Sequence, residues 1–297
     1  MIDRHFYIAC RSAIETLKPG HVAVDDDGRE IDVAEFLRGV AAAAPEIARQ
    51  DAGVGERVLS AVRAMQAAMG RSIGAHIAMI CAPLAMAGER KGPLPRNVHA
   101  VLAEATASDV EQMFEAMTLV SSATFADVFG DVDPAMRGSL TRAIRAAAEH
   151  DSVARLYAEA FSSLFRRVLP PFLRTLQRRQ SKPWAAVECY LRWLALWPDS
   201  EIVHRYGAQA GTAVQTKARG LLDSMERSRT LDAMVPLLRD WDAELKMLHL
   251  SPGASATLTV GTLFAWQLRS MHERDEAEEL GSGDVDLGAI LTTPSAG

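Results

Sequence analysis

The sequence predicts an all-α protein, and three observations lead to this prediction. The 297 residues are rich in Ala, Leu, Met and Arg, which favour helices, whereas aromatic residues make up only 6%. Apolar residues recur at three- and four-residue steps over long stretches, which is the spacing of one helix face. Alternation typical of a strand is confined to residues 22–24. We therefore expect a single domain of about ten helices around a buried central helix.

The helical repeat is clearest in residues 58–69, 153–168 and 231–250. In the last of these segments, Pro236 is compatible with a helix if it lies in the first turn. Turn-forming residues predict where the helices break, at residues 18–29, 88–97, 129–138, 169–172, 181–183, 197–200 and 251–253.

The run from Ile73 to Ala87 is apolar nearly all round, so we expect it to be the buried central helix. It contains His76 and Pro83 and is shorter than the roughly 20 residues that a membrane span needs. The helical domain is predicted to cover residues 1–274. Residues 275–297 become acidic and then small and polar, which predicts a flexible tail.

Charge and cysteine content exclude several classes of protein. The net charge of −6 argues against nucleic-acid binding. The three cysteines are far apart and lack CxxC spacing, which argues against disulfides and a zinc site. The first residues lack the apolar core of a signal peptide, so we expect a cytoplasmic protein without a membrane segment.

Two proline–glycine turns suggest a phosphate site. Ser251-Pro252-Gly253 leads into an apolar helical run, and the free N–H groups at such a helix start favour anions. Lys18-Pro19-Gly20 lies near the other end of the chain and carries a positive charge. If the two turns meet in the fold, the residues expected to bind the anion are Lys18, Pro19, Gly20, Ser251, Gly253, Ser255 and Thr257.

Four segments, in order, resemble the triphosphoribosyl-dephospho-CoA synthase family. They are Glu15 to Val22 with the following Asp27 to Phe36, Gly55 to Leu84, Pro198 to Gly207, and Ser251 to Phe264. The resemblance implies an all-α fold and an enzyme that joins ATP to 3′-dephospho-CoA with release of adenine. It also implies ATP and Mg²⁺ as small-molecule partners.

The chain departs from the family pattern at polar positions. Ser72-Ile73-Gly74-Ala75-His76 stands where the family usually has Asn-Thr-Asn-Leu-Gly, and Thr257 stands where it has Asp. Amide and carboxylate groups suited to ribose, phosphate or Mg²⁺ are thereby lost. The resemblance leaves the catalytic residues unknown. It implies Ser72, His204 and Arg205 as further nucleotide contacts, and Asp32 and Glu15 as metal ligands, although His204 and Arg205 are equally compatible with an exposed helix start. Arg71 is either a new anion contact or the solvated start of a helix. Asp199 follows Pro198 and is at least as compatible with a cap of the helix that contains His204 as with a site residue.

Two functions remain open at this stage. The first is transfer of a triphosphoribosyl group from ATP to an acceptor such as 3′-dephospho-CoA. The second is a catalytically altered family member that binds a nucleotide or a partner subunit, with a link to one-carbon (pterin) cofactor metabolism. A homo-oligomer or a pairing with a paralogue fits the second function, with Trp184, Trp193 and Trp197 as an interface unless they pack in the core.

Overall fold

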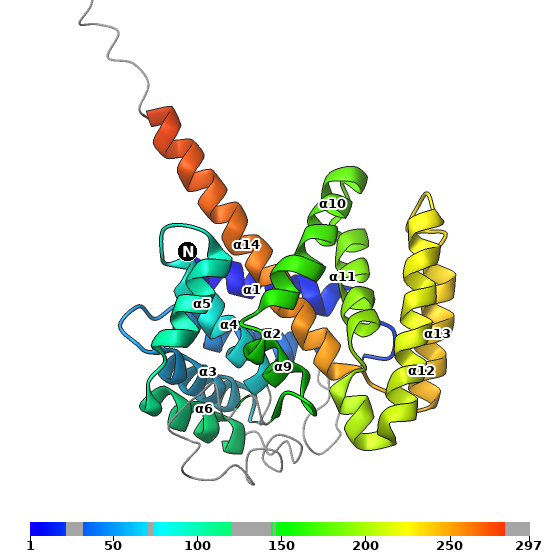
Figure 1. The fold of residues 1–297 in the computed structure, drawn as a ribbon, viewed down its shortest axis with the longest axis horizontal. Helices are drawn as coiled ribbons and strands as arrows, with labels where there is room; N and C mark the ends of the chain where they lie inside the picture. Colours follow the sequence, from blue (N-terminus) through cyan, green and yellow to red (C-terminus); the bar gives the residue numbers. More distant parts are fainter. Residues whose placement is uncertain (22–31, 71–73, 120–143, 145–146, 283–297) are drawn as a thin grey trace, which may run out of the picture.

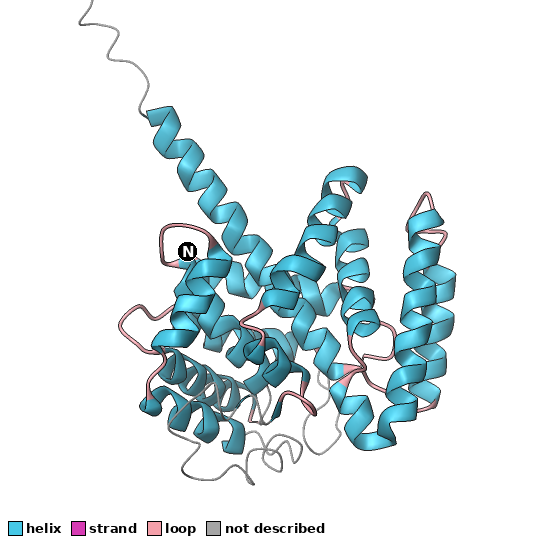
Figure 2. Ribbon diagram, in the orientation of Figure 1, coloured by secondary structure: helices cyan, strands magenta, loops and turns pink. Residues whose placement is uncertain are grey.

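The computed structural model describes residues 1–21, 32–70, 74–119, 144 and 147–282. All regular structure in these ranges is helical (Figure 2), which confirms the predicted all-α fold. The helices in chain order are α1 (Ile2–Glu15), α2 (Val33–Ile47), α3 (Val54–Met69), α4 (Ala75–Gly88), α5 (Leu94–Glu104), α6 (Ala107–Leu119), α9 (Ser152–Ala158), the π-helix η2 (Leu164–Val168), α10 (Leu169–Arg179), α11 (Lys182–Leu196), α12 (Ser200–Arg227), α13 (Val235–Met247) and α14 (Gly253–Ser282).

Helix α4 is the central helix, as its apolar sequence predicts. Apart from His76 and Met86, every residue of α4 is buried. Helices α1, α2, α3, α5, α6, α9 and α14 surround it. Because it is covered on all sides, its sequence has no polar face. Within the described ranges, every helix falls short of the length and apolarity that a bilayer crossing requires.

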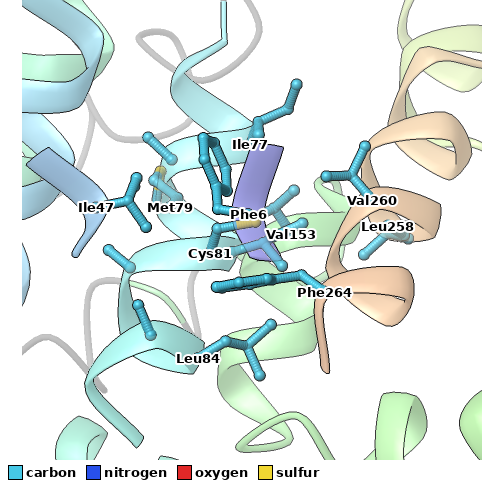
Figure 3. Packing of buried hydrophobic residues seen from close by; sticks show 14 of the residues in the cluster. Phe6, Ile47, Ile77, Met79, Cys81, Leu84, Val153, Leu258, Val260 and Phe264 are labelled. Atoms are coloured by element: carbon cyan, nitrogen blue, oxygen red, sulfur yellow. The ribbon is translucent and has the colours of Figure 1, made fainter. Parts of the chain in front are cut away.

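The larger of two apolar clusters forms where α4 meets α1 and α14. Figure 3 shows Phe6, Cys81 and Phe264 converging there from these three helices. The rings of Phe6 and Phe264 lie 5.8 Å apart and are nearly perpendicular, at 80°, a favourable arrangement for aromatic pairs. All three cysteines are free and buried.

A second apolar cluster joins α11 to the antiparallel pair α12 and α13, which stands at one edge of the molecule (Figure 1). Helix α11 contributes to both clusters, with Cys189 and Trp193 in the first and Tyr190 and Leu194 in the second. Trp184, Trp193 and Trp197 are all buried in these clusters. Core packing therefore accounts for the three tryptophans.

Helix α14 crosses the molecule and connects the two clusters. Ala256 belongs to the second cluster, and Leu258, two residues further along the helix and on its opposite side, belongs to the first. The helix then runs beside α1 and continues to Ser282 (Figure 1). The beginning of the predicted tail at residue 275 is therefore helical, and residues 283–297 lie outside the described residues.

The segment 153–182 differs from its prediction. The expected continuous helix over residues 153–168 is divided into α9 and η2, because Ala160 and Phe161 adopt positive φ angles of 46° and 62°. The expected break at residues 169–172 is wrong, since α10 begins at Leu169 directly after η2. Its prolines lie in the first turn, where a helix does not need their N–H groups.

Several predicted boundaries agree with the structure. Helix α11 begins directly after Ser181, α12 after Asp199 and α14 after Pro252. Pro236 lies in the first turn of α13, as expected. The strand-like residues 22–24 and the break at 129–138 lie outside the described residues.

Candidate active site

Asp199 begins α12 and caps it. The Oδ1 atom of Asp199 accepts hydrogen bonds from the backbone N–H groups of Glu201 at 3.1 Å and Ile202 at 3.4 Å. Asp199 adopts the extended backbone that a capping residue needs, with φ −63° and ψ 123°. The residue is only 1% exposed, so this cap lies inside the protein.

The second oxygen of the same carboxylate holds the start of α14. Asp199 Oδ2 accepts the backbone N–H of Ser255 at 2.8 Å and its hydroxyl at 2.7 Å. Burial raises the pKa of Asp199, while the bonds from Ser255 and α12 act in the opposite direction. One carboxylate thus satisfies free N–H groups at the starts of two helices.

Glu201 lies beside Asp199 and against the first residue of α14. A Cβ atom on Gly253 would collide with the Glu201 carboxylate, so glycine lets this carboxylate lie where it does. Burial raises the pKa of Glu201 to about 8, the negative charge of Asp199 adds to the rise, and Arg205 opposes it. The start of α14 therefore already faces two carboxyl groups of the chain itself.

The turn after Lys18 packs against the turn that leads into α14. The carbonyl of Pro19 accepts the hydroxyl of Tyr190 at 2.8 Å, and the N–H of Gly20 donates to Asp242 Oδ1 at 2.8 Å. A Cβ atom on Gly20 would stand 2.8 Å from the carbonyl oxygen of Leu250. Because Leu250 directly precedes Ser251, the two proline–glycine turns are neighbours.

A buried ammonium group, that of Lys18, lies at this pair of turns. The Lys18 ammonium is buried and donates to the carbonyls of Ala13 and of Thr16, the latter at 3.4 Å, at the end of α1. Burial lowers the pKa of Lys18 to about 8. Burial first, and then the charges of Lys18 and Lys246, lower the pKa of His21 to about 3. In the described part of the chain, the buried Nδ1 atom of His21 has no hydrogen-bond partner.

The sequence of residues 1–276 matches the family model described as ATP:dephospho-CoA triphosphoribosyl transferase. The chain belongs to this family. A crystal structure titled as a putative triphosphoribosyl-dephospho-CoA synthase from Archaeoglobus fulgidus has a similar fold, with a TM-score of 0.59 and 21% sequence identity, over 77% of this chain and 97% of that one. A search of curated proteins gave no significant match.

The matched range, residues 1–276, includes all the segments on which the resemblance rested. Family membership agrees with an all-α synthase-like transferase and does not favour the alternative of a non-catalytic subunit. ATP and dephospho-CoA are the substrates that the family description names. In this family member, both proline–glycine turns and the Asp199 cap lie together.

The other residues expected in the transferase's site are distributed as follows. His204 and Arg205 are exposed in the first turns of α12, close to Glu201, and Ser251 and Thr257 are half-buried around the start of α14. Ser255 is buried, and both its N–H and its hydroxyl are used by Asp199. Arg71 and Ser72 lie outside the described residues.

The two carboxylates expected to bind a metal have other partners. Asp32 caps α2 by accepting the N–H of Glu35 at 2.8 Å, and Glu15 pairs with Arg11 at 2.8 Å on α1. In the ranges that the structure describes, no group of three or more His, Cys, Asp or Glu residues could hold a metal ion. These residues do not fit a magnesium site, so Mg²⁺ stays a prediction from the resemblance.

The sequence does not single out Glu201 as a site residue, and it leaves Asp199 open between a helix cap and a site residue. The order Pro-Asp before a helix is enough to predict a cap. Its second role depends on Ser255, which is 56 residues away in the sequence. Nothing in the local sequence around Asp199 indicates that partner.

Proposed function

We propose that this chain transfers the triphosphoribosyl group of ATP to 3′-dephospho-CoA and releases adenine. The bond between ribose C1′ and adenine breaks, a bond from C1′ to the acceptor's 2′-hydroxyl oxygen forms, and the hydroxyl proton balances the charge of the departing adenine. The match of residues 1–276 to the family model carries this proposal. The neighbouring proline–glycine turns support its location.

Lys18, His204 and Arg205 are assigned to the triphosphate. An ammonium group has three donors, and Lys18 uses two of them on the carbonyls of Ala13 and Thr16. One donor is left for a phosphate oxygen, and the negative charge of a phosphate would return the pKa of Lys18 toward its ordinary value. His204 and Arg205 are exposed in the same region and can close on the substrate from α12.

Asp199 and Ser255 are assigned a positioning role. Their hydrogen bonds fix the starts of α12 and α14 relative to each other. Ser255 cannot give its N–H and hydroxyl to a phosphate while Asp199 holds them. Ser251, Gly253 and Thr257 then shape the approach of the substrate beside this pair, with Pro19 and Gly20 on the facing turn.

Glu201 is assigned the proton transfer. Its pKa of about 8 is near the working pH of a cell, which suits a group that must both accept and release a proton. The carboxyl lies at the start of α14, between Asp199 and Gly253. It would take the proton of the acceptor hydroxyl and return it to the departing adenine.

The test is an assay of adenine release from ATP, with and without 3′-dephospho-CoA, followed by chromatography. Arg205→Gln should lower kcat/KM by about 10- to 100-fold, the effect of losing one charge-assisted contact. Glu201→Gln should lower kcat and flatten the pH profile of the rate near pH 8. Arg239→Gln, an exposed change on α13, is the control and should leave the rate unchanged.

Two outcomes would contradict parts of the proposal. If the wild-type chain releases no adenine with either substrate present, the transferase activity is refuted. If it does so and Arg205→Gln behaves as Arg239→Gln does, the activity stands and the assigned location is wrong.

A further inference from the structure

Helices α10, α11 and the end of α12 enclose a pocket of about 420 Å³ that is separate from the candidate active site. Its lining includes four arginines and two glutamates, together with Trp184 and Met225. We call it the arginine pocket. Its volume lies within the range of about 300–1,000 Å³ that is usual for small-molecule sites.

Two of the four arginines already have partners. Arg179 lies over the Trp184 ring at 4.8 Å and donates to the carbonyls of Ser228 and Arg229, both at 2.7 Å, after the end of α12. Arg192 donates to Glu188 at 2.7 Å and lies 3.6 Å from Glu226. Both glutamates of the pocket are thus next to the same arginine.

The other two arginines, Arg174 and Arg178, lack partners of this kind within the described ranges. Among the described residues, neither guanidinium is paired with a carboxylate. They are four residues apart on α10, so their side chains lie on one face with Cβ atoms about 5–6 Å apart. Two like charges at this spacing repel each other unless an anion lies between them.

The chemistry of the pocket favours a phosphorylated ligand. A guanidinium binds phosphate oxygens through paired N–H groups, and two of them one helix turn apart match adjacent phosphates. Pro171, Trp184 and Met225 also line the pocket but are buried, so the surface open to a ligand is mainly that of the charged side chains.

We propose that the arginine pocket binds a small molecule carrying a diphosphate group, with Arg174 and Arg178 as the phosphate ligands. Glu188 is buried and accepts hydrogen bonds from Arg192 and from the hydroxyl of Thr175, so its charge is already matched within the pocket. None of these residues belongs to the candidate active site. The inference therefore does not depend on the proposed function.

Calorimetric titration of the full chain with inorganic pyrophosphate tests the proposal. The pocket variant is Arg174→Gln/Arg178→Gln. Its matched control is Arg96→Gln/Arg239→Gln, which removes the same charge from exposed positions on α5 and α13. We expect the wild type and the control to show a binding event that the pocket variant loses or shows at least about tenfold weaker.

Circular dichroism must show the same helix content in all three proteins, which the exposure of these arginines favours. The proposal is overturned if pyrophosphate titrates the pocket variant and the control identically, or if it does not bind the wild type. It is also overturned if an oligoglutamate peptide, but not pyrophosphate, binds in a way that needs Arg174 and Arg178, because the pocket would then serve a protein partner.

Discussion

At the scale of single residues, the carboxylate of Asp199 accepts hydrogen bonds from two helices. It receives N–H groups of α12 on one oxygen and the N–H and hydroxyl of Ser255 on the other. An amide in its place offers only one acceptor oxygen and adds a donor. The buried donors of Ser255 would then face an NH₂ group.

We expect Asp199→Asn to lower the free energy of unfolding by about 1–3 kcal/mol, the cost of leaving a buried donor unsatisfied. Urea denaturation followed by circular dichroism measures the change. Asp223→Asn, an exposed substitution on the same helix, should have little effect. Equal unfolding midpoints for the two variants would show that the bonds from Asp199 to α14 contribute nothing.

Glu201 makes the stability of the protein depend on pH. Its pKa rises from the ordinary 4.5 to about 8 in the folded chain. The folded state therefore binds the proton more tightly, and stability decreases as the pH rises from about 4.5 to about 8. Burial raises the pKa of Asp199 as well, which acts in the same direction.

We expect the thermal midpoint of the wild type to fall between about pH 5 and pH 8, and Glu201→Gln to reduce that fall. Scanning calorimetry at several pH values provides the comparison. Glu244→Gln, an exposed substitution on α13, should keep the wild-type dependence of the thermal midpoint on pH. If the thermal midpoint of Glu201→Gln depends on pH as the wild-type midpoint does, the pKa of Glu201 is not raised in the folded chain.

Single residues also mark the limit of prediction from sequence. The sequence predicts the local cap of Asp199 and the turns at Pro19 and Pro252, because each depends on neighbouring residues alone. It does not predict that the carboxyl groups of Asp199 and Glu201 face the start of α14. Those contacts join residues more than 50 positions apart and exist only after the helices have packed.

At the scale of helices, α14 can start where it does because Gly253 leaves room for Glu201. We expect Gly253→Ala to destabilise the fold only modestly, since the added methyl group displaces the Glu201 carboxylate, which is the movable end of its side chain. Gly220→Ala in α12 is the control, because its Cβ would meet no atom within 4 Å. That change should stabilise α12 by about 0.5–1 kcal/mol.

The two substitutions are thus expected to have opposite signs. Chemical denaturation of both variants, under one set of conditions, measures them together. If Gly253→Ala is as stable as Gly220→Ala, Glu201 has room to turn away and does not constrain the start of α14.

A buried hydrogen bond joins α11 to α14. The indole N–H of Trp193 donates to the Thr262 hydroxyl at 3.0 Å, and both residues are fully buried. We expect Thr262→Val to cost about 1–3 kcal/mol, because the indole donor loses its acceptor while the shape is kept. Thr262→Ser retains the hydroxyl and should recover most of that loss in the same denaturation experiment.

Should Thr262→Val be as stable as the wild type, the hydrogen bond from Trp193 to Thr262 would contribute nothing to stability.

The contrast between α9 and α13 shows how far helices can be predicted. Residues 231–250 follow one repeat, and their central part forms one helix, α13 (Val235–Met247). Residues 153–168 follow a repeat equally well, yet Ala160 and Phe161 adopt left-handed backbone angles that no periodic pattern indicates.

At the scale of the whole molecule, a ligand that binds the folded chain raises its stability. We expect ATP at about a hundredfold excess over its Kd to add about 2.7 kcal/mol, seen as a higher melting temperature. Adenosine should have a much smaller effect, because the proposed contacts of Lys18 and Arg205 are to phosphates. Equal shifts with ATP and adenosine would contradict those contacts.

The all-α fold and the central helix were predictable because both depend on composition and on the length of one apolar run. The division of the interior into two apolar clusters was not. It arises because α11 presents Trp193 to one cluster and Tyr190 to the other, and periodicity alone does not distinguish two buried faces from one.

The position of Asp199 at the boundary of the two clusters has a consequence for enzyme inactivation. If the start of α12, which a break at Gly207 separates from the rest of the helix, detaches from α14 while the larger cluster stays folded, Asp199, Glu201 and Arg205 move away from Ser255. Such partial opening would abolish turnover with most of the helical signal intact. Amide exchange at the start of α14 would then report the loss of activity earlier than the melting of α4 does.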